Sequence, residues 1–183
     1  MGRVCTLEDE AAFAELMQRW EQPIKRYLAR MVLNSGDAED LAQESFVRLY
    51  QQRARFEQGQ PFAPWLYAIA TNLARNRLRW WKRRPSVDLD SWTRNPSAAQ
   101  IEPVPGAAEL LERTERARQV RLVVAELPVG LREVVVLCEF EELGQAEAAR
   151  VLGTTQKAVE HRLSRARDRL RTRLAALAQG ERR

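Results

Sequence analysis

The feature that most constrains this fold is a proline-rich segment at residues 85–106, PSVDLDSWTRNPSAAQIEPVPG, which holds four of the eight prolines. Proline lacks the backbone N–H that a helix needs, and its ring clashes with the preceding turn, so no helix continues through this segment. Because an unstructured stretch of this length is unusual inside a compact domain, we interpret the segment as a linker. We therefore expect two modules, residues 1–84 and residues 107–183, joined by residues 85–106.

The N-terminal module shows the apolar spacing of helices, at every third or fourth residue, and no β alternation of any length. One helix is expected to end near NSGD, residues 34–37. Asp37 is then the expected N-cap of the next helix, DAEDLAQESFVRLYQQ, because its carboxylate can accept from the first free backbone N–H groups. A third helix is expected over residues 62–84, after the loop RFEQGQPFAP.

The C-terminal module has the pattern of a helix-turn-helix. A short helix is expected from Gln145 to Leu152 and ends at Gly153, whose missing Cβ suits a tight turn. Thr154 or Thr155 can cap the longer helix that follows. The expected fold class is all-α, with two small helical domains and a helix-turn-helix in the second.

Composition excludes several classes of protein. Two distant cysteines and one histidine argue against a zinc site and a disulfide scaffold, and no stretch of 18 apolar residues predicts a membrane span. No signal peptide is recognisable. No catalytic triad, carboxylate pair or phosphate-binding glycine loop is evident, so we expect a protein that is not an enzyme, without cofactor or metal, in a reducing cytoplasm.

The distribution of charge points to an anionic partner. The net charge is +5, with +4 in residues 1–84 (14 basic against 10 acidic), −2 in residues 85–106 (1 against 3) and +3 in residues 107–183 (15 against 12). Both modules are therefore basic, which favours nucleic acid.

The third expected helix has an apolar face and a cationic face, because successive helical residues are rotated by about 100°. The cationic face and its shoulder comprise Asn72, Arg75, Asn76, Arg79, Lys82 and Arg83. Cations gathered without nearby acids repel one another unless an anion such as backbone phosphate neutralises them, and the two amides can address unpaired bases. Basic amphipathic helices also bind membrane surfaces, so this pattern alone leaves both alternatives open.

Two adjacent tryptophans occur within this basic run, RNRLRWWKRRP. Periodicity places Trp80 on the apolar face, where we expect it to anchor the helix. Trp81 lies at the edge of that face, where a core position and a platform for an unstacked base are both open.

The second helix of the helix-turn-helix is strongly basic, with seven cations from Lys157 to Arg173 against Glu160 and Asp168. Such a helix is typical of one that enters the major groove of DNA. The residues expected to face DNA are Lys157, Glu160, His161, Arg162, Ser164 and Arg165.

The two modules, in this order, resemble the extracytoplasmic-function (ECF, group IV) class of bacterial RNA polymerase sigma factors. The resemblance rests on DAEDLAQESFVRLY, PWLYAIATNLARNRLRWWKRR and ELPVGLREVVVLCEFEELGQAEAARVLGTTQKAVEHRLSRARDRLR, which cover well over half of the chain. The residues VEH after the turn resemble the iron-transport branch of this class.

The resemblance implies a role for each group of residues. The surface that docks on the β and β′ subunits of core RNA polymerase would comprise Asp40, Gln43, Glu44, Phe46 and Val47. The loop from Arg55 to Pro64 would capture an unstacked base of the promoter −10 element, and the cationic helix face would contact the same element. The exposed residues of the helix-turn-helix would read the −35 element.

The sequence departs from the family pattern at four positions. Glu142 and Gly144 stand where the family usually has Gly and a capping Ser, and Ala148 replaces a larger aliphatic residue. Glu160 replaces a basic residue, and an acid there prefers a cytosine amino group to a phosphate neighbour.

The function implied is that of an alternative sigma factor, monomeric in the holoenzyme, that directs promoter-specific initiation without membrane insertion. The resemblance also implies an anti-sigma factor, which in many relatives is membrane-bound and would hold the protein at the inner membrane. The alternative is a stand-alone helix-turn-helix regulator that binds duplex DNA without core polymerase. A basic membrane-surface protein would explain residues 62–84 but not the second module.

Overall fold

The computed structural model describes residues 10–57, 59–83 and 107–180, and the prediction of an all-α fold is confirmed over these residues. The α-helices are α2 Glu10–Val32, α3 Ser35–Gln51, α4 Phe62–Arg83, α6 Ala107–Ala125, α7 Val129–Val135, α8 Gln145–Leu152 and α9 Gln156–Gly180. A 3₁₀ turn, Arg53–Arg55, follows α3, and a π-helical turn, Val136–Phe140, follows α7. The expected linker, residues 85–106, lies outside the described residues.

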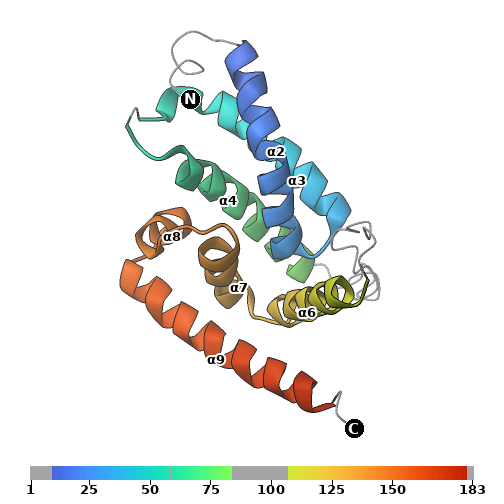
Figure 1. Cartoon of the computed structure of the whole chain (residues 1–183). Helices are drawn as coiled ribbons and strands as arrows, with labels where there is room; N and C mark the ends of the chain where they lie inside the picture. The colour runs from blue at the N-terminus through green and yellow to red at the C-terminus, as the bar shows by residue number, and fades with distance from the viewer. Residues whose placement is uncertain (1–9, 58, 84–106, 181–183) are drawn as a thin grey trace.

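Helices α2, α3 and α4 pack together as the N-terminal group (Figure 1). Helix α3 buries one face, which comprises Ala38, Leu41, Ala42, Ser45 and Leu49. The prediction that Asp37 is the N-cap of this helix is wrong. Helix α3 begins at Ser35, three residues before the expected first helical residue, Ala38. The side chain of Asn34 accepts from the backbone N–H of Asp37 at 2.9 Å, so Asn34 is the N-cap and Asp37 lies in the first turn.

Helices α6 to α9 form the C-terminal group, and the predicted helix-turn-helix is confirmed. Helix α8 spans Gln145–Leu152, as expected, and Gly153 adopts the left-handed conformation with φ of 63°. Of the two candidate caps, Thr155 accepts from the N–H of Ala158 at 3.2 Å. At the start of α8, the N–H of Gly144 donates to Glu147 at 3.1 Å, so the helix is stabilised without a serine cap.

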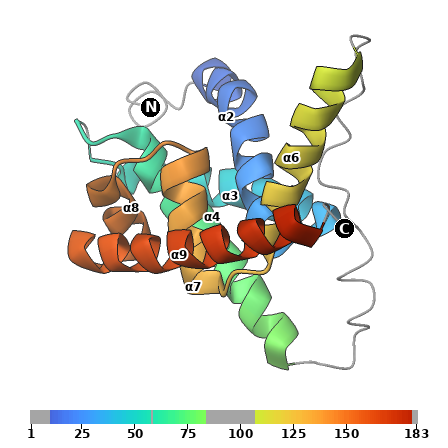
Figure 2. The ribbon, with the colours of Figure 1, turned by 60° about the horizontal axis from the view of Figure 1, so that its bottom comes forward.

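The two groups pack on each other, with α8 against α4 and α7 against α2 (Figures 1 and 2). Their buried apolar residues form one continuous core. Arg132 of α7 crosses the junction, because it donates to the carbonyls of Met31 near the end of α2, of Ala125 at the end of α6 and of Leu127 just after α6. Burial lowers the pKa of Arg132 to about 10. The carbonyl ends of two helices are therefore satisfied by one guanidinium.

The turn between the π-helical segment and α8 contains a strained residue. Glu142, where the related family usually has Gly, has φ of 55° and an exposed side chain. A residue with a Cβ pays about 1–2 kcal/mol in the left-handed region, whereas glycine does not.

We expect Glu142→Gly to raise the free energy of unfolding by about 0.5–1 kcal/mol, because relief of this strain exceeds the entropy that glycine adds to the unfolded chain. Urea-induced unfolding followed by circular dichroism measures the change. Ala146→Gly on the exposed side of α8 is the matched control, and we expect it to destabilise by about 1 kcal/mol. Equal destabilisation by both variants would show that Glu142 is not strained.

Candidate nucleic-acid interface

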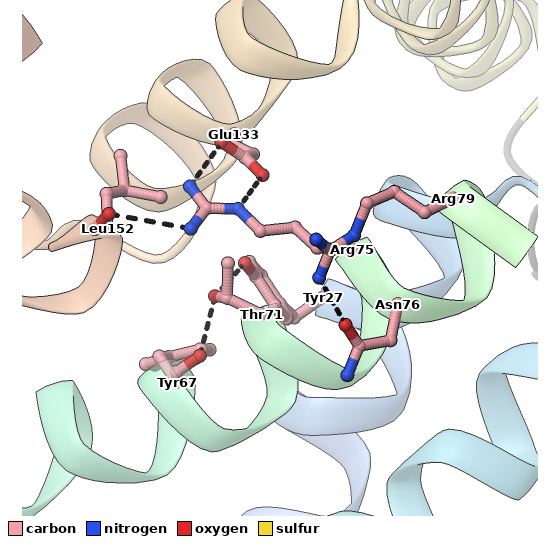
Figure 3. Close-up of polar contacts among 8 residues, drawn as sticks. All are labelled: Tyr27, Tyr67, Thr71, Arg75, Asn76, Arg79, Glu133 and Leu152. Carbon is pink, nitrogen blue, oxygen red and sulfur yellow. Dashed lines mark hydrogen bonds and ion pairs between the residues drawn. The ribbon is translucent and has the colours of Figure 1, made fainter.

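Helix α4 separates into a buried face and an exposed face. The buried face comprises Leu66, Ile69, Ala70, Leu73 and Ala74. Of the predicted −10 contact residues, five are exposed to solvent: Asn72, Asn76, Arg79, Lys82 and Arg83. Arg79 donates to the side-chain oxygen of Asn76, so the amide N–H groups of Asn76 remain available to an acceptor (Figure 3).

Arg75, the sixth predicted −10 residue, differs from the expectation of a solvent-facing cation. Its guanidinium donates to both carboxylate oxygens of Glu133 in α7, at 2.6 and 2.8 Å, and approaches the carbonyl of Leu152 at 3.5 Å (Figure 3). The hydrogen bonds that Arg75 donates to Glu133 raise the pKa of Arg75. In this structure, Arg75 is therefore part of the contact between the two helical groups.

A second cation of the basic run is also neutralised by the protein. Arg77 forms an ion pair with Asp37 in the first turn of α3. The sequence run has no acid among its cations, but the fold supplies Asp37 from 40 residues away and Glu133 from 58 residues away. Among the described cations of this run, packing thus pairs two arginines with acids and leaves Arg79, Lys82 and Arg83 exposed.

The tandem tryptophans lie over a groove between α3 and α4 of about 500 Å³, which Leu41, Leu73 and Asn76 also line. Their rings meet edge to face with centroids 5.1 Å apart. The expectation that Trp80 is a core anchor is wrong, because its side chain is 38% exposed. The last turns of α4 extend beyond the helices that cover its middle (Figure 2). Trp80 lies in these turns, so no other helix encloses it fully although it has the periodicity of the apolar face. Trp81 is the more enclosed of the two.

The predicted polymerase-docking surface on α3 is exposed in part. Asp40, Gln43 and Val47 are exposed, with Val47 at 54%, and Glu44 forms an ion pair with Arg48 at 2.6 Å. Phe46 is a correction to this set, because it is 3% exposed and belongs to the core. Phe46 therefore lies beneath the exposed residues of this face rather than among them.

The aromatic residues around the loop after α3 form a cluster. Phe56 lies 5.1 Å from Trp65 and 6.1 Å from Phe62, and Phe62 lies 5.6 Å from Trp20 (centroid distances). The expected base-capture loop, residues 55–64, therefore lies on aromatic side chains, although residue 58 is outside the described residues.

The first turns of α9 present the predicted −35 residues. Lys157, Glu160, His161, Ser164 and Arg165 are exposed and Arg162 is half-buried, as expected for a helix anchored by the buried Val159, Leu163 and Ala166. Gln156 donates to Glu160 at 2.9 Å, which orients this carboxylate.

Arginines further along α9 face acids of the same helical group. Arg167 donates to Glu139 and Arg173 to Glu126, with shortest distances of 2.6 and 2.7 Å. The two parts of α9 therefore differ: the first turns present polar groups outward, and the later arginines hold the helix against its neighbours. The sequence did not predict this division of α9, nor did it predict that Glu133 pairs with Arg75. Both depend on which residues meet in the fold, and no sequence motif marks them.

Among the described residues, no three His, Cys, Asp or Glu side chains gather closely enough to bind a metal ion. Within the same residues, no helix combines the length and apolar character needed to cross a membrane.

Comparison with known proteins agrees with the division into two helical groups. The family models for sigma-70 region 2 and sigma-70 region 4 match residues 16–84 and 117–170. The ECF RNA polymerase sigma factor SigW of Bacillus subtilis (strain 168) is 31% identical over 174 residues, which cover 92% of each chain. The ECF RNA polymerase sigma-E factor of Escherichia coli (strain K12) is 31% identical over 163 residues, which cover 87% of this chain and 85% of the relative.

Two solved structures have the same fold. The structure of CnrH in complex with the cytosolic domain of CnrY has a TM-score of 0.67 at 29% identity and covers 92% of this chain and 90% of that chain. The sigma factor RpoE in complex with the anti-sigma factor NepR from Bartonella quintana has a TM-score of 0.68, covering 90% and 97%. At 23% identity, the second supports the fold alone.

The different exposure of the two tryptophans predicts different effects on stability. We expect Trp81→Ala to lower the free energy of unfolding by about 2 kcal/mol and Trp80→Ala by about 1 kcal/mol, because the former removes more buried surface. Urea unfolding of both variants measures the difference. A larger loss in Trp80→Ala would contradict the placement of these rings.

Proposed function

The chain belongs to the sigma-70 family of RNA polymerase sigma factors and is of the ECF type, and from this premise we propose how its two regions recognise a promoter. In this proposal, residues 1–84 are region 2, residues 85–106 link the regions, and residues 107–183 are region 4. The protein acts without a catalytic site of its own, and the polymerase performs the chemistry.

Region 4 reads the −35 element of duplex DNA in this proposal. The observation that carries it is the exposed first part of α9, which follows the tight turn at Gly153 and is anchored on its other face by buried apolar residues. A helix held in this way can insert its first turns into the major groove. The reading residues are Lys157, Glu160, His161, Arg162, Ser164 and Arg165.

Region 2 binds and melts the −10 element in this proposal. The exposed amides of Asn72 and Asn76 address bases, while Arg79, Lys82 and Arg83 contact backbone phosphates. Unstacking a base costs a few kcal/mol, which stacking and pocket contacts offset, so binding energy rather than nucleotide hydrolysis drives the initial opening. Arg75 joins this surface when its contact with Glu133 is released, and Trp81 is the candidate stacking partner.

Core polymerase, through its β and β′ subunits, binds the exposed face of α3 in this proposal, with Asp40, Gln43, Glu44 and Val47 at the surface. The similar CnrH structure is a complex with a second protein, the cytosolic domain of CnrY, which supports a protein partner for this chain too, and we propose that this partner is an anti-sigma factor. The proposed location is the cytoplasm, at the nucleoid or held at the inner membrane by that partner. Assignment to the iron-transport branch stays a prediction based on Val159, Glu160 and His161.

Abortive and run-off transcription with purified core polymerase over a pool of genomic promoter fragments tests the function directly. We expect new, sequence-restricted initiation when this protein is added, which also yields both promoter elements. Failure to stimulate initiation, combined with shifts of duplex DNA by the protein alone, would instead establish a stand-alone regulator.

The proposal makes a specific prediction for α9. With the holoenzyme on a selected promoter, we expect Arg165→Ala to weaken binding about tenfold and to reduce the slope of log K against log salt by about 1, because a phosphate contact releases counterions. Arg171→Ala, on the same helix but paired with Asp168 at 3.3 Å, is the matched control and should change neither value. Equal losses in both variants would mean that general basicity, not the first turns, binds DNA.

A further inference from the structure

Helix α9 carries two acids among its many cations, and the two have different partners. Asp168 forms an ion pair with Arg171 at 3.3 Å. Glu160 instead accepts from the side-chain amide of Gln156 at 2.9 Å, and among the described residues no cation lies within ion-pair distance of it. Glu160 is therefore an exposed carboxylate whose charge the described part of the protein does not neutralise.

An acid in this position has a cost when the helix approaches DNA. The proposed function places the first turns of α9 in the major groove, where backbone phosphates repel a carboxylate. Lys157, three residues before Glu160 and exposed on the same side of the helix, offsets part of this repulsion. The remaining cost is recovered only if the carboxylate meets a hydrogen-bond donor on a base.

Gln156 fixes the direction in which this carboxylate points. Gln156 is the first residue of α9, so its amide holds the Glu160 side chain toward the N-terminal end of the helix. The amide donates to Oε1 of Glu160, which leaves Oε2 as a free acceptor. The N-terminal end is itself fixed, because Thr155 caps the helix and Gly153 forms the turn before it. In helix-turn-helix proteins the N-terminal residues of the second helix contact base edges.

The chemistry of a carboxylate decides which base it can read, because an ionised carboxylate only accepts hydrogen bonds. In the major groove, guanine and thymine present acceptor oxygens, which repel it. Adenine presents an amino donor, but its N7 acceptor lies beside that donor. Cytosine presents the N4 amino donor alone. Cytosine is therefore the base that suits an oriented carboxylate best.

We propose that Glu160 gives region 4 a specificity for cytosine at one position of the −35 element, by accepting a hydrogen bond from the N4 amino group. Gln156 is the positioning residue for this carboxylate. The inference rests on the proposed function of region 4 and names the base that one of its residues reads. The specificity is a property of this chain, because the related family usually has a basic residue in place of Glu160, and a basic residue prefers guanine or phosphate.

Promoter selection by the holoenzyme tests the proposal. Core polymerase with this protein selects from duplex fragments of a responsive promoter in which every position of the −35 element is randomised. We expect one position at which cytosine, on either strand, is preferred about tenfold. With Glu160→Gln we expect that position to prefer adenine, because an amide pairs with N6 and N7 of adenine. A changed preference at one position cannot result from misfolding, which weakens binding to every sequence.

Two further variants separate the roles of charge and position. Asp168→Asn is the matched control, because it removes an acid from the same helix, and it should leave every preference unchanged. Gln156→Ala should reduce the cytosine preference about threefold at the position read by Glu160 and at no other. An effect of Gln156→Ala at a different position would show that Gln156 reads a base itself, and its positioning role would be wrong. A parent protein without a cytosine preference, or one that Glu160→Gln shares, would overturn the proposal.

The selection and the transcription assay can fail separately. If the holoenzyme initiates at defined promoters but Glu160→Gln changes no preference, the reading role of Glu160 is wrong and the proposed function stands. If the protein directs no initiation, the proposed function fails, and the role of Glu160 at a −35 element is overturned with it.

Discussion

Helix α4 packs against α2 and α3 along its apolar face and against α8 along another, and the positions of the remaining elements follow from this double burial. The first contact assembles region 2. The second brings Arg75 to Glu133 and thereby orients region 4. A single helix thus carries the core of one region, the contact with the other and the proposed surface for melted DNA.

Helix α4 also shows how the fold neutralises cations that packing brings close to the core. A run of cations without internal acids is unfavourable in a compact protein, and the fold neutralises two of them with Asp37 and Glu133. Because neither acid is close in sequence, pairing depends on the tertiary arrangement. Arg77 and, in this structure, Arg75 therefore stabilise the packing of the helices, whereas Arg79 stays exposed on the face proposed to bind DNA.

Much of the architecture could be predicted from local patterns. The helix-turn-helix was predictable at residue level because glycine, threonine caps and apolar spacing act within a few residues, and α8 has the expected bounds. The errors occur where a pattern depends on neighbours. Phe46 shares the helix of the docking residues but points into the core, and Trp80 has core periodicity but lies where α4 extends beyond its cover. The observed N-cap of α3 is Asn34 and not the expected Asp37, because several polar residues at this helix start can accept from the same free N–H groups.

The sequence by itself determined the all-α class, the two regions and the faces of α4 and α9, since helical periodicity and turn chemistry are local properties. Membership of the sigma-70 family also follows from the sequence, but through its similarity to known regions 2 and 4. Only the tertiary structure decided that Arg75 meets Glu133, that Arg77 meets Asp37, and that Glu141 joins Tyr67 to Arg30. The physical reason is that periodicity assigns a side chain to a face, whereas an ion pair requires knowledge of which other helix covers that face.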